Sequence, residues 1–300
     1  MRRTYSSSDS SITPKNYFCI CNYNLRSKTI RILKQASTAP TVSVEYSLDE
    51  QRTWQSQNSS SFNITVPSMG TVYFRANTSA WGSSASYNYF ALDSNDSGCY
   101  YEFKGNIMSL LYGETFDVDN RYLTLPNTSW HFKYLFQGIT AAFRCDGLKL
   151  PATKALKESY YRMFYNATGL TSAVIKIYAT TNNGSNSMDR MFEGCSNMSA
   201  GPIFRMSFSG SYTMRGMFSN CVKLSSFSYL GTNTSSQSTS SAGDILANAG
   251  TSTSDRIINL TLHSSAISYF STFWNSLLPA SSGVRFSISA ISTDLFPNVP

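Results

Sequence analysis

Histidine and charged side chains are scarce in this chain of 300 residues. Only 14% of the residues are Asp, Glu, Lys or Arg, and the two histidines are His131 and His263. General acid–base catalysis draws mainly on His, Asp and Glu, so few groups are available for it. Neither a nucleophile elbow nor a recurring pair of carboxylates is present. We therefore expect no catalytic residues, and a glycan-active enzyme is the least favoured function.

Long apolar runs are also missing. No stretch of 18 apolar residues occurs, so no transmembrane helix is predicted. Residues 1–15 are basic and rich in Ser but contain no apolar segment typical of a secretory signal. We interpret them as a flexible or anchoring arm.

The cysteines do not form a metal-binding pattern. Six cysteines are spread over the chain, and no pair has the C-x-x-C spacing. Two histidines add too few ligands for a zinc site, so we expect neither a metal nor another cofactor. Cys19 and Cys21 are two residues apart, so in a strand both would point to the same face.

The basic excess is dispersed along the chain. The net charge is +7, but no dense Lys/Arg run or nucleic-acid motif is present, so no nucleic-acid partner is expected. Ser, Thr, Asn and Tyr are abundant instead. Polarity without charge favours a β-rich extracellular or virion protein over a cytosolic enzyme.

Residues 16–112 contain short β-rich segments separated by polar turns. Val42, Val44 and Tyr46, for example, alternate with polar residues and would share one face of a strand. About seven short strands in roughly 100 residues are typical of an immunoglobulin-like β-sandwich. Residues 113–130 break this rhythm and are interpreted as a junction and the cap of the next domain. The strands are expected at 17–22, 28–35, 41–48, 61–67, 71–77, 88–93 and 99–105.

The second half of the chain repeats itself. The strings RMFYNA, RMFEGC and GMFSNC share an apolar pair, a turn-forming residue and a small residue. With Phe192 as the anchor, equivalent positions recur every 26 to 28 residues. Such a period indicates a solenoid, in which each coil buries its apolar face against the next. The six anchors are Phe136, Phe164, Phe192, Phe218, Leu246 and Phe273.

Two positions of the repeat distinguish architecture from chemistry. Three residues after the anchor, Cys195 and Cys221 stand where other coils have Ile, Ala or Ser. A position that accepts these residues is a packing position, so both cysteines are expected to be buried, reduced and stacked in adjacent coils. Two residues after the anchor, every coil has a residue typical of turns. These are Gly138, Asn166, Gly194, Asn220, Asn248 and Asn275.

An alternating apolar segment follows each anchor by 9 to 12 residues. One strand per coil at constant phase builds a parallel sheet. The segment before an anchor, such as residues 153–166, is compatible with a short helix. We therefore predict a mainly β protein. An immunoglobulin-like β-sandwich at 16–112 would precede a six-repeat, leucine-rich-repeat-like solenoid with short helices or turns at 131–300.

The repeat motif resembles a known family. The signature MF-x-[GN]-C-x-x-[LM] is similar to the leucine-rich repeats of BspA-like (Treponema pallidum type) surface proteins of Bacteroidetes, related gut bacteria and their phages. VEYSLDEQRTW resembles the β-domain that often precedes such repeats. The resemblance implies surface exposure and adhesion or recognition, and no catalytic residues. The matching repeat residues are Met191, Phe192, Gly194, Cys195 and Met198, then Met217, Phe218, Asn220, Cys221 and Leu224.

The exposed face of the solenoid sheet is the predicted binding site. If the apolar residues of each strand point inward, the alternate residues point outward. The basic ones would form a ladder suited to an anionic or polar glycan or an acidic protein; the alternative is an ordinary solvated face. The ladder is Lys149, Lys176, Arg205 and Arg285. The other outward residues are Tyr178, Ser207, Asn259, Thr261, His263 and Ser287.

These observations predict a non-enzymatic attachment protein. The favoured interpretation is a virion-associated head fibre, decoration or tail-associated protein of a phage that infects gut Bacteroidetes. Such a protein needs no secretory signal, because host lysis releases it. Its partners would be other virion proteins, through the arm or the sandwich, and a glycan or protein of the host surface. A homo-oligomer is expected. The alternative is an adhesin on the bacterial cell surface.

Overall fold

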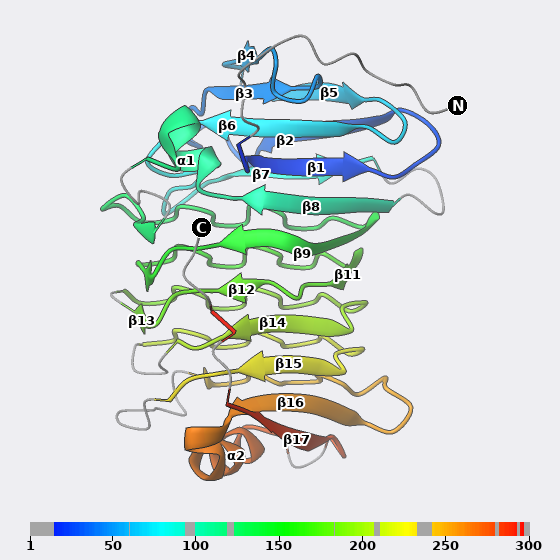
Figure 1. The fold of residues 1–300 in the computed structure, drawn as a ribbon, viewed down its shortest axis with the longest axis vertical. Helices are drawn as coiled ribbons and strands as arrows, with labels where there is room; N and C mark the ends of the chain where they lie inside the picture. Colours follow the sequence, from blue (N-terminus) through cyan, green and yellow to red (C-terminus); the bar gives the residue numbers. More distant parts are fainter. Residues whose placement is uncertain are drawn as a thin grey trace.

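The structure is a computed structural model in which β-strands are stacked along the long axis of the molecule (Figure 1). The chain is mainly β, as predicted. None of the helices in the described ranges is long and apolar enough to cross a bilayer. The described residues are 15–59, 61–93, 100–118, 123–182, 184–206, 211–232, 242–279, 282–292 and 295–296.

One sheet extends over most of the molecule. Its pairs are antiparallel from β4 to β8 and parallel from β8 onward, with each later strand bonded to its neighbour from the next coil. In pairing order the strands are β4 (Gln55–Gln57), β3 (Val44–Ser47), β6 (Thr71–Ala76), β1 (Phe18–Asn22), β8 (Tyr100–Asn106), β9 (Ala142–Leu150), β11 (Leu170–Ser172), β14 (Ala200–Phe204), β15 (Ser226–Tyr229), β16 (Ile257–His263) and β17 (Arg285–Ile291). β12 (Lys176–Ile177) lies between β9 and β14.

A second, antiparallel sheet lies behind the first strands. It has the order β5 (Phe62–Val66), β2 (Lys28–Lys34) and β7 (Asn88–Leu92). Phe90 of β7 packs against Phe18 of β1 and Phe74 of β6, with ring centroids 5.5 and 5.1 Å apart. All seven strands expected in residues 16–112 are present, because their alternation matches the burial of one side chain in two.

The expected junction does not interrupt the sheet or the core. The helix α1 (Ser109–Tyr112) and the 3₁₀ turn η1 (Gly113–Thr115) follow β8, yet β8 pairs directly with β9. One continuous cluster of buried side chains extends from Tyr17 to Val284. The two parts of the chain therefore share their core.

The segment before each anchor is not a helix in most coils, and that expectation was wrong. Residues 156–167 form overlapping tight turns instead, such as Met163 N–H to Tyr160 O and Tyr165 N–H to Arg162 O. Alternate N–H groups bond to the next coil, as Phe164 does to the carbonyl of Met191 at 2.9 Å. Only the last anchor lies in a helix of this length, α2 (Ile267–Ser276), after η4 (Ser264–Ala266).

Left-handed residues explain why these segments turn. Glu158, Arg162 and Asn166 have φ of 53°, 51° and 53°, and a left-handed residue at every fourth position excludes an α-helix. The turn position predicted from sequence is one of these columns. It is left-handed at Gly138, Asn166, Gly194, Asn220 and Asn248, whereas Asn275 lies in α2.

The anchor phenylalanines form a continuous stack. Phe164 and Phe192 are 5.2 Å apart and nearly parallel, and Phe218 follows at 6.0 Å. Phe136 extends the stack toward the first coil, 5.2 Å from Phe164. Phe136 also contacts Phe18, Phe90 and Phe103 of the two sheets. This phenylalanine column (Phe136, Phe164, Phe192, Phe218) thus joins both parts of the chain.

The two repeat cysteines are buried and unpaired, as predicted. The thiol of Cys195 donates to the carbonyl of Phe164 at 3.1 Å, and that of Cys221 to the carbonyl of Phe192 at 3.0 Å. Each cysteine therefore binds the anchor of the preceding coil. An Ala in this position lacks only that bond, which explains why the repeat tolerates it.

The chain returns over the outer face of the large sheet after β17. Phe296 packs against Tyr178, 5.1 Å away, and Arg205 lies over its ring at 4.4 Å. Leu295 joins the same small cluster. A short parallel pair, β10 (Lys154–Ala155) and β13 (Thr181–Asn182), completes the described strands.

Truncation of the phenylalanine column is expected to destabilise the protein far more than truncation of the cysteine position. Phe192→Ala removes a fully buried ring with a neighbour on each side, so we expect a loss of about 3–5 kcal/mol. Cys195→Ala removes one weak hydrogen bond and little volume, so about 1 kcal/mol is expected. Urea unfolding of both variants measures the difference; equal losses would contradict the packing role.

Candidate functional site

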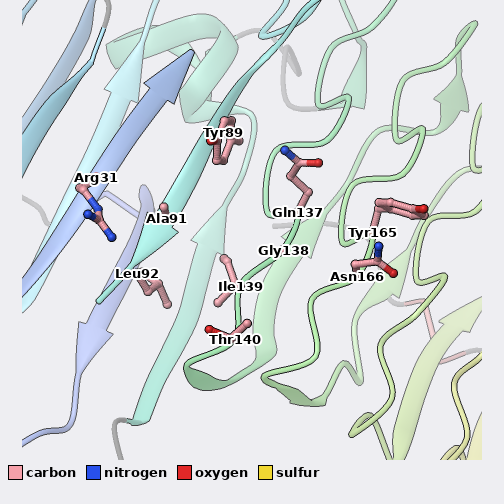
Figure 2. A pocket seen from close by; sticks show the side chains of 10 residues that line it. All are labelled: Arg31, Tyr89, Ala91, Leu92, Gln137, Gly138, Ile139, Thr140, Tyr165 and Asn166. Atoms are coloured by element: carbon pink, nitrogen blue, oxygen red, sulfur yellow. The ribbon is translucent and has the colours of Figure 1, made fainter. Parts of the chain in front are cut away.

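A groove opens where the three-stranded sheet meets the first two coils (Figure 2). Its volume is about 420 Å³, within the range of small-molecule sites. It lies on the side of the molecule away from the predicted sheet face. The lining residues are Arg31, Tyr89, Ala91, Leu92, Gln137, Gly138, Ile139, Thr140, Tyr165 and Asn166.

Strand alternation supplies one wall of the groove. Phe90 points into the core, so its neighbours Tyr89 and Ala91 point out of β7. Arg31 pairs with Ala91 in the register of β2 and β7 and is exposed between buried Ile30 and Ile32. The wall therefore presents an aromatic ring beside a guanidinium group.

The turns of the first two coils supply the other wall. Gly138 and Asn166 are left-handed and exposed, which carries the chain around the groove rim. Gln137 lies before Gly138 and hydrogen-bonds to the Tyr87 side chain, while burial, the stronger effect, raises the Tyr87 pKa. The amide groups of Gln137 and Asn166 thus face the same opening as Tyr165 (Figure 2).

A cluster of tyrosines continues from the groove over the turns. Tyr87 stacks on Tyr134 with centroids 4.3 Å apart, and the Tyr165 ring meets Tyr134 edge-on at 6.0 Å. Arg162 fixes these rings: it lies 4.7 Å from the centre of Tyr165 and donates to the Tyr134 hydroxyl at 2.7 Å. Tyr161 completes the cluster beneath Arg162, 5.2 Å from its guanidinium.

The charge of the groove is positive. Arg31 is the charged residue among those that line it, and none of the lining residues is Asp, Glu or His. The guanidinium of Arg31 makes no hydrogen bond or ion pair with any residue in the described ranges. The groove can therefore bind a polar ligand by ring stacking, amide hydrogen bonds and a cation, but it lacks an acid–base pair for hydrolysis.

The predicted basic ladder is only partly formed. Lys149 of β9 and Lys176 of β12 are direct neighbours in the parallel register, and both are half-buried. The same row continues through Ile203, Ser228 and Thr261, so no further cation extends it. Shifts in register between coils account for this, because the coils differ in length by one or two residues.

The other predicted site residues lie elsewhere on the sheet. Arg205 is two residues beyond Ile203, and Arg285 pairs with Ile257, four residues before Thr261. Tyr178 is buried under Phe296, so it does not offer a free face. Asn259 pairs with Ser287, and His263 lies at the end of β16, where its Nδ1 is 2.7 Å from the Ser265 hydroxyl. Ser207 is outside the described residues.

Sequence reasoning missed the groove. Its walls come from segments about 100 residues apart, β2 and β7 on one side and the first coils on the other. A signal was present in the tyrosines on both sides of the second anchor, Tyr161 and Tyr165, with Tyr134 before the first. Only the fold brings them to Tyr87 and Tyr89.

Neither histidine belongs to a cluster suited to metal binding. In the described part of the chain, no three His, Cys, Asp or Glu side chains are grouped closely enough to hold an ion. His131 is fully buried at the start of the first coil. Its Nε2 lies 2.9 Å from the carbonyl of Pro126 and must carry the proton, while Nδ1 has no partner.

Protonation of His131 is expected to destabilise the protein at acidic pH. Burial lowers the pKa of its imidazole to about 4, against about 6.5 in the unfolded chain. Between these values only the unfolded state binds the proton, so the free energy of unfolding falls as the pH falls, by about 2 kcal/mol from pH 7 to pH 5. Urea unfolding at both pH values measures this loss. It should shrink in His131→Gln, and an unchanged loss in that variant would rule His131 out.

Comparisons with protein-family models, curated proteins and solved structures found no match to this chain. The arguments for its function therefore come from the groove, the tyrosine cluster and the architecture that positions them.

Proposed function

We propose that the protein is a non-enzymatic attachment protein that binds a saccharide of a host surface in the groove between β7 and the first two coils. The observation that carries this proposal is the composition of the groove. Tyr89 and Tyr165 offer ring faces on which the C–H groups of a sugar can stack, and Gln137 and Asn166 offer amides for its hydroxyl groups. Arg31 adds an unpaired cation.

The rigidity of the tyrosine cluster supports recognition. A ring fixed before binding loses little conformational freedom when a ligand stacks on it. Arg162 holds Tyr165 and Tyr134 by a cation–π contact and a hydrogen bond, and Tyr87 closes the cluster from β7. Tyr and Arg are also the residues that contribute most to binding at protein surfaces.

The architecture supports a surface role. We class residues 16–112 as an immunoglobulin-like β-sandwich, because two sheets enclose Phe18, Phe74 and Phe90. We class residues 131–300 as a leucine-rich-repeat-like solenoid of the BspA-like type, because strands pair in parallel at one per coil. Both classes would fit a protein that displays a binding site away from its anchor.

We favour a virion-associated protein, such as a head fibre, decoration or tail-associated protein of a phage of gut Bacteroidetes. The basic arm, which lies outside the described residues, would dock on other virion proteins, and the assembly would be a homo-oligomer. The second proposal is a bacterial cell-surface adhesin, and a glycan-active enzyme is the least favoured. Mass spectrometry of purified virions separates the first two: the protein is present only if it is a virion component.

Removal of the groove rings is expected to abolish saccharide binding. On an array of bacterial surface oligosaccharides, Tyr89→Ala and Tyr165→Ala should each weaken the bound signal at least about tenfold, since a central aromatic contact contributes more than 1 kcal/mol. Tyr269→Ala is the matched control, because Tyr269 is 38% exposed on α2, far from the groove along the chain axis. Circular dichroism verifies the fold of each variant. Equal binding by the groove variants and the control would contradict the proposal, as would no binding by the native protein.

A further inference from the structure

Two cysteines outside the groove form a pair on the outer face of the large sheet. Cys19 and Cys21 point away from the core, because Phe18 and Ile20 of the same strand point into it. In the register of β1 with its neighbours, Cys19 lies between Tyr73 and Lys104. Cys21 lies in the same way between Thr71 and Glu102. Each cysteine retains a small exposure, 7% and 8%.

These two thiols differ from the other described cysteines. Cys145, Cys195 and Cys221 are fully buried, and each donates its thiol hydrogen to a backbone carbonyl. Burial raises the thiol pKa in all three, so they remain protonated. They are packing residues and are too well enclosed to bind a ligand.

The sulfur of Cys21 is an acceptor instead. It accepts from the Thr71 hydroxyl at 3.5 Å and from the thiol of Cys19. The hydrogen bond from Cys19 is the main reason that the pKa of Cys21 is lowered to about 6, and it raises the pKa of Cys19. At neutral pH the pair therefore holds one thiolate beside one thiol, which is the form that binds soft metals.

Cationic side chains are available to balance a negative site. Lys104 donates to Glu102 at 2.7 Å, and Arg144 contacts the other oxygen of that carboxylate at 3.2 Å. Two cations against one carboxylate leave an excess positive charge beside the thiolate. A second thiolate formed on metal binding would be stabilised by this excess.

Strand geometry favours a bridging ion over a disulfide. Residues two apart in a strand have Cα atoms about 6.6 Å apart, near the upper end of the range of about 4.4–6.8 Å for disulfides. A direct S–S bond would therefore bend the strand, whereas an ion between the sulfurs spans a greater distance. No third His, Cys, Asp or Glu is grouped with them in the described ranges, so a four-coordinate zinc site is excluded there.

We propose that Cys19 and Cys21 bind one thiophilic monovalent cation of the copper(I) class as a two-coordinate dithiolate. Both sulfurs bind the ion as thiolates, and the thiol proton of Cys19 is released to solvent. Thiolates select copper(I) over harder cations, which agrees with the lack of carboxylate ligands. This site does not depend on the saccharide groove.

The test is an anaerobic titration of the intact protein with copper(I), in competition with a chromogenic copper(I) chelator. The native protein should take up one equivalent and show thiolate-to-copper charge-transfer absorption. Cys19→Ser and Cys21→Ser should each lose this equivalent, while Cys99→Ser and Cys145→Ala should retain it. Uptake should strengthen from pH 5 to pH 8, since protons are displaced.

Two results would overturn the proposal. One is native protein that takes up no copper(I), and the other is a double variant, Cys19→Ser with Cys21→Ser, that still takes up one equivalent. Alkylation with iodoacetamide at pH 7, followed by peptide mass spectrometry, gives a readout without metal. Cys21 should be modified at least tenfold faster than Cys195 in the folded protein, and equal rates would likewise contradict a poised thiolate.

Discussion

The phenylalanine column is the interaction on which the rest of the molecule depends. Each ring is contributed by a different coil, so a ring can be buried only if the coils are stacked in register. At its upper end Phe136 packs among Phe18, Phe90 and Phe103, which belong to the two sheets of the first part of the chain. The column therefore fixes the first coil against β7. The groove exists because those two surfaces are held at a constant distance.

The period of the repeat could be predicted because it reflects this column. Phe164 and Phe192 recur at a constant phase, and the burial of Cys195 followed from comparing the residues that share its position. The strands of the first part were predictable for a similar reason, since alternation is a local property. The turns before each anchor were not, because a pattern such as that of residues 153–166 also fits a helix. Hydrogen bonds to the next coil, which no single segment encodes, decide between the two.

The candidate site shows where sequence reasoning ends. The ladder of Lys149, Lys176 and Arg205 assumed that all coils have equal length, but the register shifts by a residue or two from coil to coil. The groove depends on contacts between β2, β7 and the first coils, so no local pattern marks it. Sequence reasoning did place Cys19 and Cys21 on one face of a strand. Which neighbours they have, and that the sulfur of Cys21 accepts hydrogen bonds, required the structure.

The most direct test of this account is hydrogen–deuterium exchange, read by mass spectrometry, of a Phe136→Ala variant at neutral pH. If the column couples the two parts of the chain, amide exchange should accelerate in peptides from β1 and β7 and in residues 160–167, as well as in the first coil. Peptides from β16 and β17, far from Phe136, should keep their native rates. Faster exchange confined to residues 131–140 would contradict the account, because the column would then carry no coupling between the parts that form the groove.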